Sequence, residues 1–223
     1  MSERLLFLDD DSAADALTFA GRASRLVEDA VRLQAASGTV AMTAAPLAAH
    51  GLLDPTPTVL ALRALRVDPE LVCDIAVTAS GLAADALDPR ALTLPETGVS
   101  PAWAGVSPPR AGWSAAGEIP AATLASRAQW GIASVAETVP TDAGEDAVRA
   151  VRAAIWGAAD ESLQGLPLGV AFAAFAMGFI GGEEQARVFR AGPWTRLSLA
   201  RGHVLSRGPA RVGLTAVRET GRR

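Results

Sequence analysis

The chain has 223 residues, half of them hydrophobic, and a formal net charge of −4. This length can bury a core, and this hydrophobic content excludes a disordered chain. One cysteine, Cys73, and two histidines, His50 and His203, cannot form an internal disulfide and are too few for a usual zinc site, so we expect no metal and no cofactor.

Charge and residue usage are uneven along the chain. Residues 185–223 contain nine arginines and a single acid, Glu219, so the preceding part is strongly acidic. Lysine, asparagine and tyrosine do not occur, which is typical of a GC-rich genome. An acidic body with a basic end favours self-association or an anionic partner.

The first half is predicted to be mostly strands. In chain order we expect a strand at 4–8, a helix at 12–27, strands at 31–36, 39–44, 58–67 and 71–77, and a short helix to about residue 87. The clearest local signal is Ser37-Gly38, a two-residue turn between alternating segments, in which the glycine supplies the positive φ that the turn needs. The apolar stretch Leu5–Leu8 is too short for a signal peptide and acids follow it, so we expect a cytoplasmic protein.

The segment 88–117 is rich in proline and glycine and is the best candidate boundary inside the chain. We expect a single α+β domain over residues 1–223, in which this segment joins two possible subdomains, 1–90 and 118–207.

Three helices are expected after this boundary. Pro120 suits the first position of one helix, and Asp142 and Glu145 have the spacing of a capping box for the next. The third covers residues 166–180, which are too few to span a membrane and contain proline and glycine. We therefore predict a core helix there, with its three phenylalanines, Phe172, Phe175 and Phe179, on one buried face.

The chain is predicted to close with strands at 187–190, 194–200 and 203–207, the last two joined through Arg201-Gly202. This hairpin repeats the pattern of the first one. Either a helix–hairpin unit was duplicated, or two-residue turns share their residues for physical reasons. The predicted fold is α+β: an antiparallel sheet built from hairpins, with helices packed on one face.

An acidic cluster, Asp9 to Asp11, follows the first strand. It resembles the strand ends that hold Mg²⁺ in receiver domains and in haloacid dehalogenase phosphatases. Both families also place a lysine on the phosphoryl group, and this chain has none. We therefore interpret the cluster as a helix cap, with its charges on the helix dipole.

Two other places carry candidate site residues. The loop 103–113 contains Trp103, Arg110 and Trp113, which form either an interaction loop or a loop fixed to the body by its tryptophans.

The outward face of the last hairpin carries the second set. A turn at Arg201-Gly202 would place Arg196 opposite Arg207, with His203 on the same face. Paired arginines need an anion, which is either a diffusible ligand or a carboxylate of the acidic body, and we expect the carboxylate.

The strand–helix–hairpin–strand order of the first half resembles a half-domain of DNA sliding clamps. Clamps need basic helices along the DNA, whereas here Asp15 and Glu28 offset Arg22 and Arg25, and the second half departs from that order. We therefore do not expect nucleic acid as a partner.

Three segments, Ser2–Asp9, Trp103–Arg110 and Gly192–Leu197, resemble a conserved hypothetical protein family of actinobacteria over most of the chain. The resemblance implies a lineage and a cytoplasmic location and adds no chemistry.

Taken with the missing catalytic motifs, these features favour a cytoplasmic, non-catalytic binding or adaptor protein. Its partner would be another protein or a second copy of the chain, and not a membrane. The alternative is an enzyme acting on a small anionic substrate, bound through Arg196, His203 and Arg207.

Overall fold

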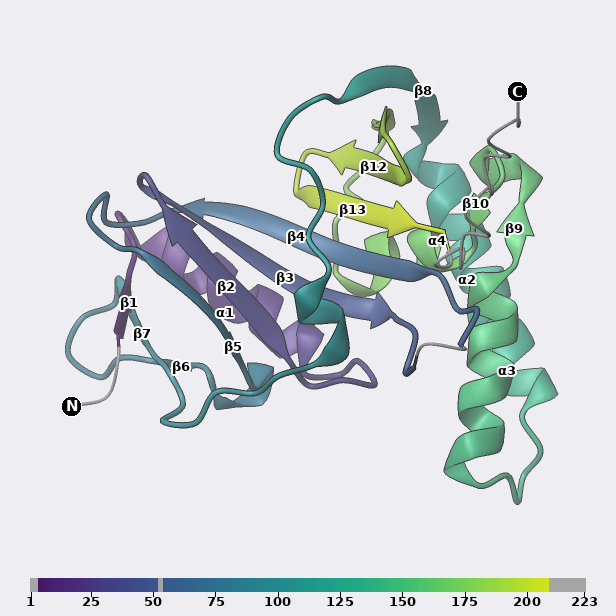
Figure 1. Cartoon of the computed structure of the whole chain (residues 1–223), viewed down its shortest axis with the longest axis horizontal. Coiled ribbons are helices and arrows are strands. Elements are labelled where there is room, and N and C mark those ends of the chain that lie inside the picture. The colour runs from purple at the N-terminus through teal and green to yellow at the C-terminus, as the bar shows by residue number, and fades with distance from the viewer. Residues whose placement is uncertain (1–3, 52–53, 209–223) are drawn as a thin grey trace, which may run out of the picture.

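The computed structural model describes residues 4–51 and 54–208 and confirms the α+β fold built on antiparallel strands (Figure 1). One eight-stranded sheet in the order β5-β2-β3-β4-β13-β12-β11-β8 runs through both halves of the chain. Its strands are β2 (Val31–Ala36), β3 (Thr39–Leu47), β4 (Thr58–Arg66), β5 (Cys73–Val77), β8 (Ser114–Pro120), β11 (Gln185–Ala191), β12 (Trp194–Leu199) and β13 (Gly202–Arg207). The halves meet where β4 pairs with β13.

The α-helices of the described residues are α1 (Asp10–Ala23), α2 (Ala121–Thr138), α3 (Glu145–Gly157) and α4 (Gly169–Ala176). Short strands form two further small sheets: β1 (Arg4–Leu6), β7 (Ala91–Thr93) and β6 (Ala83–Ala84) in one, and β9 (Ala159–Asp160) and β10 (Leu166–Pro167) in the other. Short 3-10 helices cover Ala79–Gly81, Ala102–Gly105 and Glu161–Leu163.

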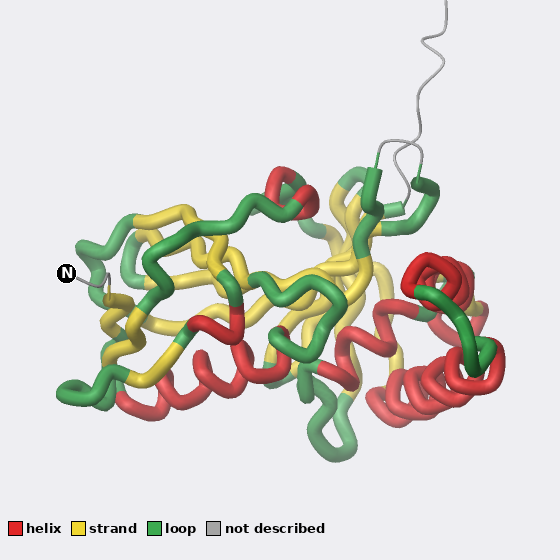
Figure 2. Tube along the Cα trace, turned by 90° about the horizontal axis from the view of Figure 1, so that it is seen from below, coloured by secondary structure: helices red, strands yellow, loops and turns green. Residues whose placement is uncertain are grey.

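The two faces of the large sheet have different covers. Alternation along β4 points Val59 and Ala61 into the main core with the helices, and points Leu60 to the opposite face. On that opposite face Trp103 and Trp194 form a second, smaller core with Leu60. Figure 2 shows the long helices below and beside the strands, with loops and a short helical segment above them. The expectation of helices on one face is therefore confirmed, and a loop covers the other.

Local signals placed most elements correctly. The Ser37-Gly38 hairpin forms as expected, with Ala36 paired to Thr39. The helix expected over residues 12–27 covers Asp10–Ala23 instead, and its cap is Asp9, which accepts a hydrogen bond from the Ser12 amide at 2.7 Å. The capping box of α3 is wrong, because Gly144 occupies the cap position and no side chain bonds there. Part of the expected loop segment is instead strand: it ends in β8, whose bulge beside Gly117 hides the alternation.

The expected core helix over residues 166–180 is wrong in its extent. α4 ends at Ala176, and Gly178, with φ +64, turns the chain. The helical period therefore does not reach Phe179, which is buried beyond the helix, while Phe175 on the helix is 40% exposed. Only Phe172 of the helical pair packs inward, where its ring stacks on Trp156 at a centroid distance of 4.6 Å.

The last hairpin has a different register from the expected one. Its turn is Ala200-Arg201, since Leu199 pairs with Gly202. Arg196 therefore lies opposite Leu205, and Arg207 lies opposite Trp194. The expected direct pairing of the two arginines is wrong, although both remain on the same face of the sheet.

Candidate functional site

A groove of about 920 Å³ lies between the loop-covered face of the sheet and the loop 107–113. The β2–β3 hairpin end and the start of β5 form one side, and β12 and β13 form the other. Its charged side chains are Asp74, Arg110 and Arg196, and His203 lies among them. The volume is within the range of about 300–1,000 Å³ that is usual for ligand sites.

Arg196, on β12, lies at one side of the groove between two aromatic rings. Its guanidinium carbon is 4.7 Å from the ring centroids of both Trp113 and Phe189. Its Nε is buried without a hydrogen-bond partner, and no carboxylate in residues 4–51 or 54–208 forms an ion pair with it. Burial and, secondarily, Arg187 lower the pKa of Arg196. The expected bridging carboxylate is therefore wrong for the described part of the chain.

His203, on β13, lies in this positive environment. Burial lowers its pKa most, and Arg196, Arg63 and Arg187 lower it further. The imidazole is thus held neutral at pH 7, with Nδ1 hydrogen-bonded to Ser198 Oγ at 3.0 Å. An anion placed beside it would reverse the electrostatic part of this shift.

The loop that forms the roof of the groove is fixed to the sheet by Arg32 on β2. Its guanidinium donates to both carboxylate oxygens of Asp74 at 2.8 Å, to the Ala104 carbonyl at 2.6 Å and to Ser107 Oγ at 3.0 Å. Hydrogen bonds from Arg32 are the main cause that lowers the pKa of Asp74. The Trp113 indole donates to the Pro109 carbonyl at 2.9 Å, which closes the proline turn. The loop and the sheet are therefore held together at the groove by contacts within the chain.

The structure brings together residues from both candidate sets. Arg110 and Trp113 from the loop line the same groove as Arg196 and His203 from the hairpin. Trp103 does not line the groove. Its side chain is 3% exposed and packs in the smaller core, which also contacts Val106 and Trp113 of the loop. Arg207 lies outside the groove lining, beside Trp194.

Sequence reasoning missed three residues that complete this arrangement, namely Arg32, Asp74 and Phe189. Arg32 falls on the polar side of the alternating strand 31–36, but its partner Asp74 is 42 residues away in the sequence. Phe189 follows the alternation of β11, so its face could be read from the pattern, whereas its contact with Arg196 could not.

Catalytic geometry is weak at this site. Ser198 and His203 form the only serine–histidine hydrogen bond among the described residues, yet Ser198 is 7% exposed and is not part of the groove lining. Within residues 4–51 and 54–208, no acid contacts His203 to orient it as a base.

None of the helices in the described part of the chain is long and apolar enough to cross a membrane.

Two family models, each described as a domain of unknown function, match the chain: DUF8010 over residues 1–105 and DUF8185 over residues 108–211. Each covers slightly less than half of the chain. No curated protein matches it.

Several solved sliding clamps are similar to the chain. The DNA polymerase sliding clamp from Caulobacter crescentus is 13% identical and aligns over 99% of this chain and 69% of its own, with a TM-score of 0.45. The griselimycin-bound clamp from Bartonella birtlesii is 13% identical over 93% and 65%, with a TM-score of 0.48. The clamp from Pseudomonas aeruginosa is 8% identical over 99% and 68%, with a TM-score of 0.45. Such values say nothing of function, and they give no support to the expectation that nucleic acid is not a partner.

Proposed function

We propose that the protein is a non-catalytic binding or adaptor protein whose groove receives a carboxylate-bearing segment of a partner protein. The observation that carries this proposal is Arg196, a guanidinium held between two rings at the groove with no carboxylate partner in the described part of the chain. A buried polar group without a partner costs about 1–3 kcal/mol, and a charged one costs more. A ligand carboxylate would supply the missing acceptor.

The rest of the groove fits the same kind of ligand. Arg110 and His203 add donors, while Leu62, Leu205 and Trp113 offer apolar surface beside them. Interfaces commonly centre on a tryptophan or arginine that is shielded from water. The proline turn loses little conformational entropy when a ligand binds, because its φ angles are already fixed.

The proposal also places the protein in the cytoplasm of an actinobacterium. Its partner is either a different protein or a second copy of the chain. The absence of lysine and asparagine supports the lineage, and the acidic body supports a second copy, because it supplies carboxylates for the groove.

The second candidate function is an enzyme that acts on a small anionic substrate. The Ser198–His203 hydrogen bond is the observation that favours it. Its weakness is the burial of Ser198 outside the groove lining.

Anion-dependent melting tests the proposal. Phosphate, compared with chloride at equal ionic strength, should raise the melting temperature of the wild type by several degrees and leave Arg196→Leu unchanged. Arg207→Leu is the matched control, since Arg207 lies on the same face outside the groove lining, and it should respond like the wild type. An equal response in all three proteins would refute the site.

A peptide titration then separates the two functions. A fluorescent acidic hexapeptide should bind the wild type and Ser198→Ala equally, and Arg196→Leu at least tenfold more weakly. Turnover of a small carboxylate or phosphate ester that Ser198→Ala abolishes would favour the enzyme instead.

A further inference from the structure

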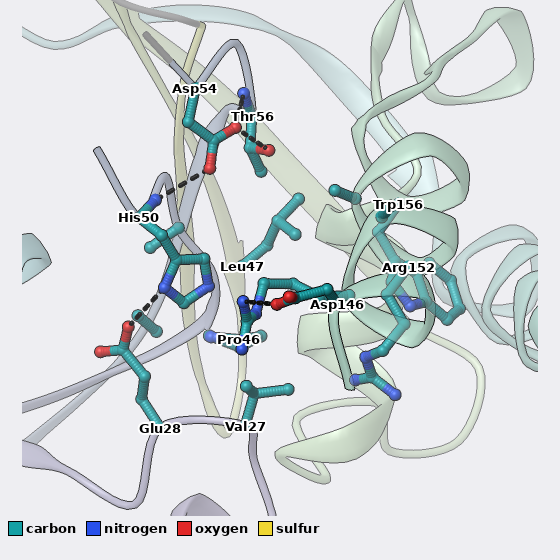
Figure 3. Close-up of a pocket in the computed structure, with 15 residues that line it drawn as sticks. Val27, Glu28, Pro46, Leu47, His50, Asp54, Thr56, Asp146, Arg152 and Trp156 are labelled. Carbon is teal, nitrogen blue, oxygen red and sulfur yellow. Dashed lines mark hydrogen bonds and ion pairs between the residues drawn. The ribbon is translucent and has the colours of Figure 1, made fainter. Parts of the chain in front are cut away.

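A second pocket, of about 230 Å³, lies away from the groove, between the end of β3 and helix α3 (Figure 3). Its volume is below the about 300–1,000 Å³ of drug-sized sites, so only a small molecule fits. One wall comes from Val27 and Glu28 after α1, from the end of β3 and from His50, Asp54 and Thr56. The other wall comes from α3. The pocket is thus formed between the two matched halves, where ligand sites are common.

Most of the pocket surface is apolar and rigid. Leu47 and Pro46 line one wall, and Trp156, 2% exposed and stacked on Phe172, lines the other. Two alanines of α3, Ala150 and Ala153, leave room between them. This lining suits an aliphatic group of a few carbons.

Two carboxylates that line the pocket already have partners within the chain. Asp54 accepts hydrogen bonds from the His50 amide at 2.9 Å and from both donors of Thr56, so it fixes the loop. Asp146 is paired with Arg149 at 2.8 Å. Asp54 therefore serves the loop, and Asp146 is an exposed carboxylate that already has a cation beside it.

Glu28 and Arg152 are different. Glu28 Oε1 lies 3.6 Å from His50 Nδ1, but its Oε2 is buried and has no hydrogen-bond partner within residues 4–51 and 54–208. Among the described residues, Arg152 has no carboxylate partner and lies 5.8 Å from the Phe172 ring centroid. Burial lowers the pKa of Arg152, as expected for a cation that has lost water without gaining an anion. Figure 3 shows the two side chains on opposite walls.

A ligand with a single charge would pair with one of these two groups and leave the other without a partner. An amine would satisfy Glu28 and add a second cation facing Arg152, and a carboxylate would do the reverse. A zwitterion supplies a donor for Glu28 and an acceptor for Arg152 together.

We propose that this pocket binds a small aliphatic α-amino acid, with its ammonium group on Glu28, its carboxylate on Arg152 and its side chain against Leu47 and Trp156. The site is independent of the groove and of the function proposed for it.

Calorimetric titration of the full chain tests this proposal with three probes that share the same branched alkyl group: L-leucine, 3-methylbutylamine, which lacks the carboxylate, and 4-methylpentanoate, which lacks the ammonium group. L-leucine should bind saturably, and the amine and the acid at least tenfold more weakly. No saturable binding of L-leucine or L-valine at millimolar concentration would overturn the proposal, and so would equal binding of either single-charge probe.

Variants locate the bound amino acid. Glu28→Gln and Arg152→Gln should each weaken L-leucine at least tenfold, whereas the exposed controls Glu137→Gln and Arg190→Gln should bind like the wild type. Arg196→Leu should also bind normally, which separates this pocket from the groove. If both pocket variants bind L-leucine with unchanged affinity, the amino acid binds elsewhere and the proposal is wrong. If a pocket variant does not fold, the comparison of the three probes on the wild type still decides.

Discussion

The guanidinium of Arg196 lies 4.7 Å from the ring centroid of Trp113, and this contact joins the last hairpin to the proline-rich loop. The loop is also held from the other side of the groove, where Arg32 bonds Ala104 and Ser107. The groove therefore depends on two arginines that approach the same loop from strands in different halves of the chain.

The first prediction concerns this contact. Trp113→Leu and Arg196→Leu should be coupled by about 0.5–2 kcal/mol, the range of a cation–π interaction that is partly shielded from water. A double-mutant cycle by urea unfolding measures the coupling. The Trp113→Leu and Arg207→Leu pair serves as the control and should be additive. Additivity in the Arg196 cycle would show that the ring and the guanidinium do not stabilise each other.

The second prediction is a pH dependence caused by His203. Its pKa is lower in the folded protein than the unfolded value of about 6.5, so the unfolded chain binds the proton first as pH falls. The neutral imidazole contributes its full stability above about pH 6.5, and this contribution is lost as pH falls through the lowered folded pKa. Relative to His203→Gln, the wild type should therefore lose stability between pH 7 and pH 5. Urea unfolding at each pH measures the difference, which should be constant from pH 7 to pH 8. A difference that stays flat down to pH 5 contradicts the burial of a neutral histidine.

The third prediction compares two glycines in helices. A Cβ on Gly131 of α2 would lie 2.2 Å from the Trp156 ring, so Gly131→Ala should destabilise by about 1–3 kcal/mol in spite of the better helix propensity of alanine. Gly21 of α1 has nothing within 4 Å of the same position, so Gly21→Ala should stabilise by up to about 1 kcal/mol. Thermal and urea unfolding of both variants gives the signs. Stabilisation by both would mean that α2 and α3 do not pack as described.

The fourth prediction replaces the expected common face of phenylalanines. Phe179 is 2% exposed, and its ring stacks on Phe19 at a centroid distance of 6.4 Å. Phe179→Ala should therefore lower the free energy of unfolding by about 3–5 kcal/mol. Phe175, 40% exposed, should cost less than about 1 kcal/mol. Urea unfolding of the two variants measures the loss of stability in each. Equal losses would support the common buried face that the sequence pattern predicted.

Local chemistry determined the elements that the sequence predicted well. The hairpin at Ser37-Gly38 follows from alternation and from a turn glycine, and the acidic cluster at residues 9–11 marks the start of α1, although the helix begins earlier than expected. These features depend on residues within a few positions of each other, so the fold class and the strands that carry Arg196 and His203 could be read from the pattern.

Tertiary structure decided the register of the second hairpin. Both Ala200-Arg201 and Arg201-Gly202 could make its turn, and packing distinguishes them. A Cβ on Gly202 would lie 2.5 Å from the Phe179 ring, so this glycine is required in the strand, against a side chain from another part of the chain.

The candidate site itself also lay beyond local reasoning. Trp113 and Arg196 are 83 positions apart, and they meet only because β8, β11 and β12 lie side by side in the sheet. The sequence by itself determined the alternation that puts Arg196 and His203 on one face. Only the tertiary structure decided that a loop closes over that face and that no described carboxylate reaches Arg196, because such contacts are set by the packing of the whole sheet and by no local pattern.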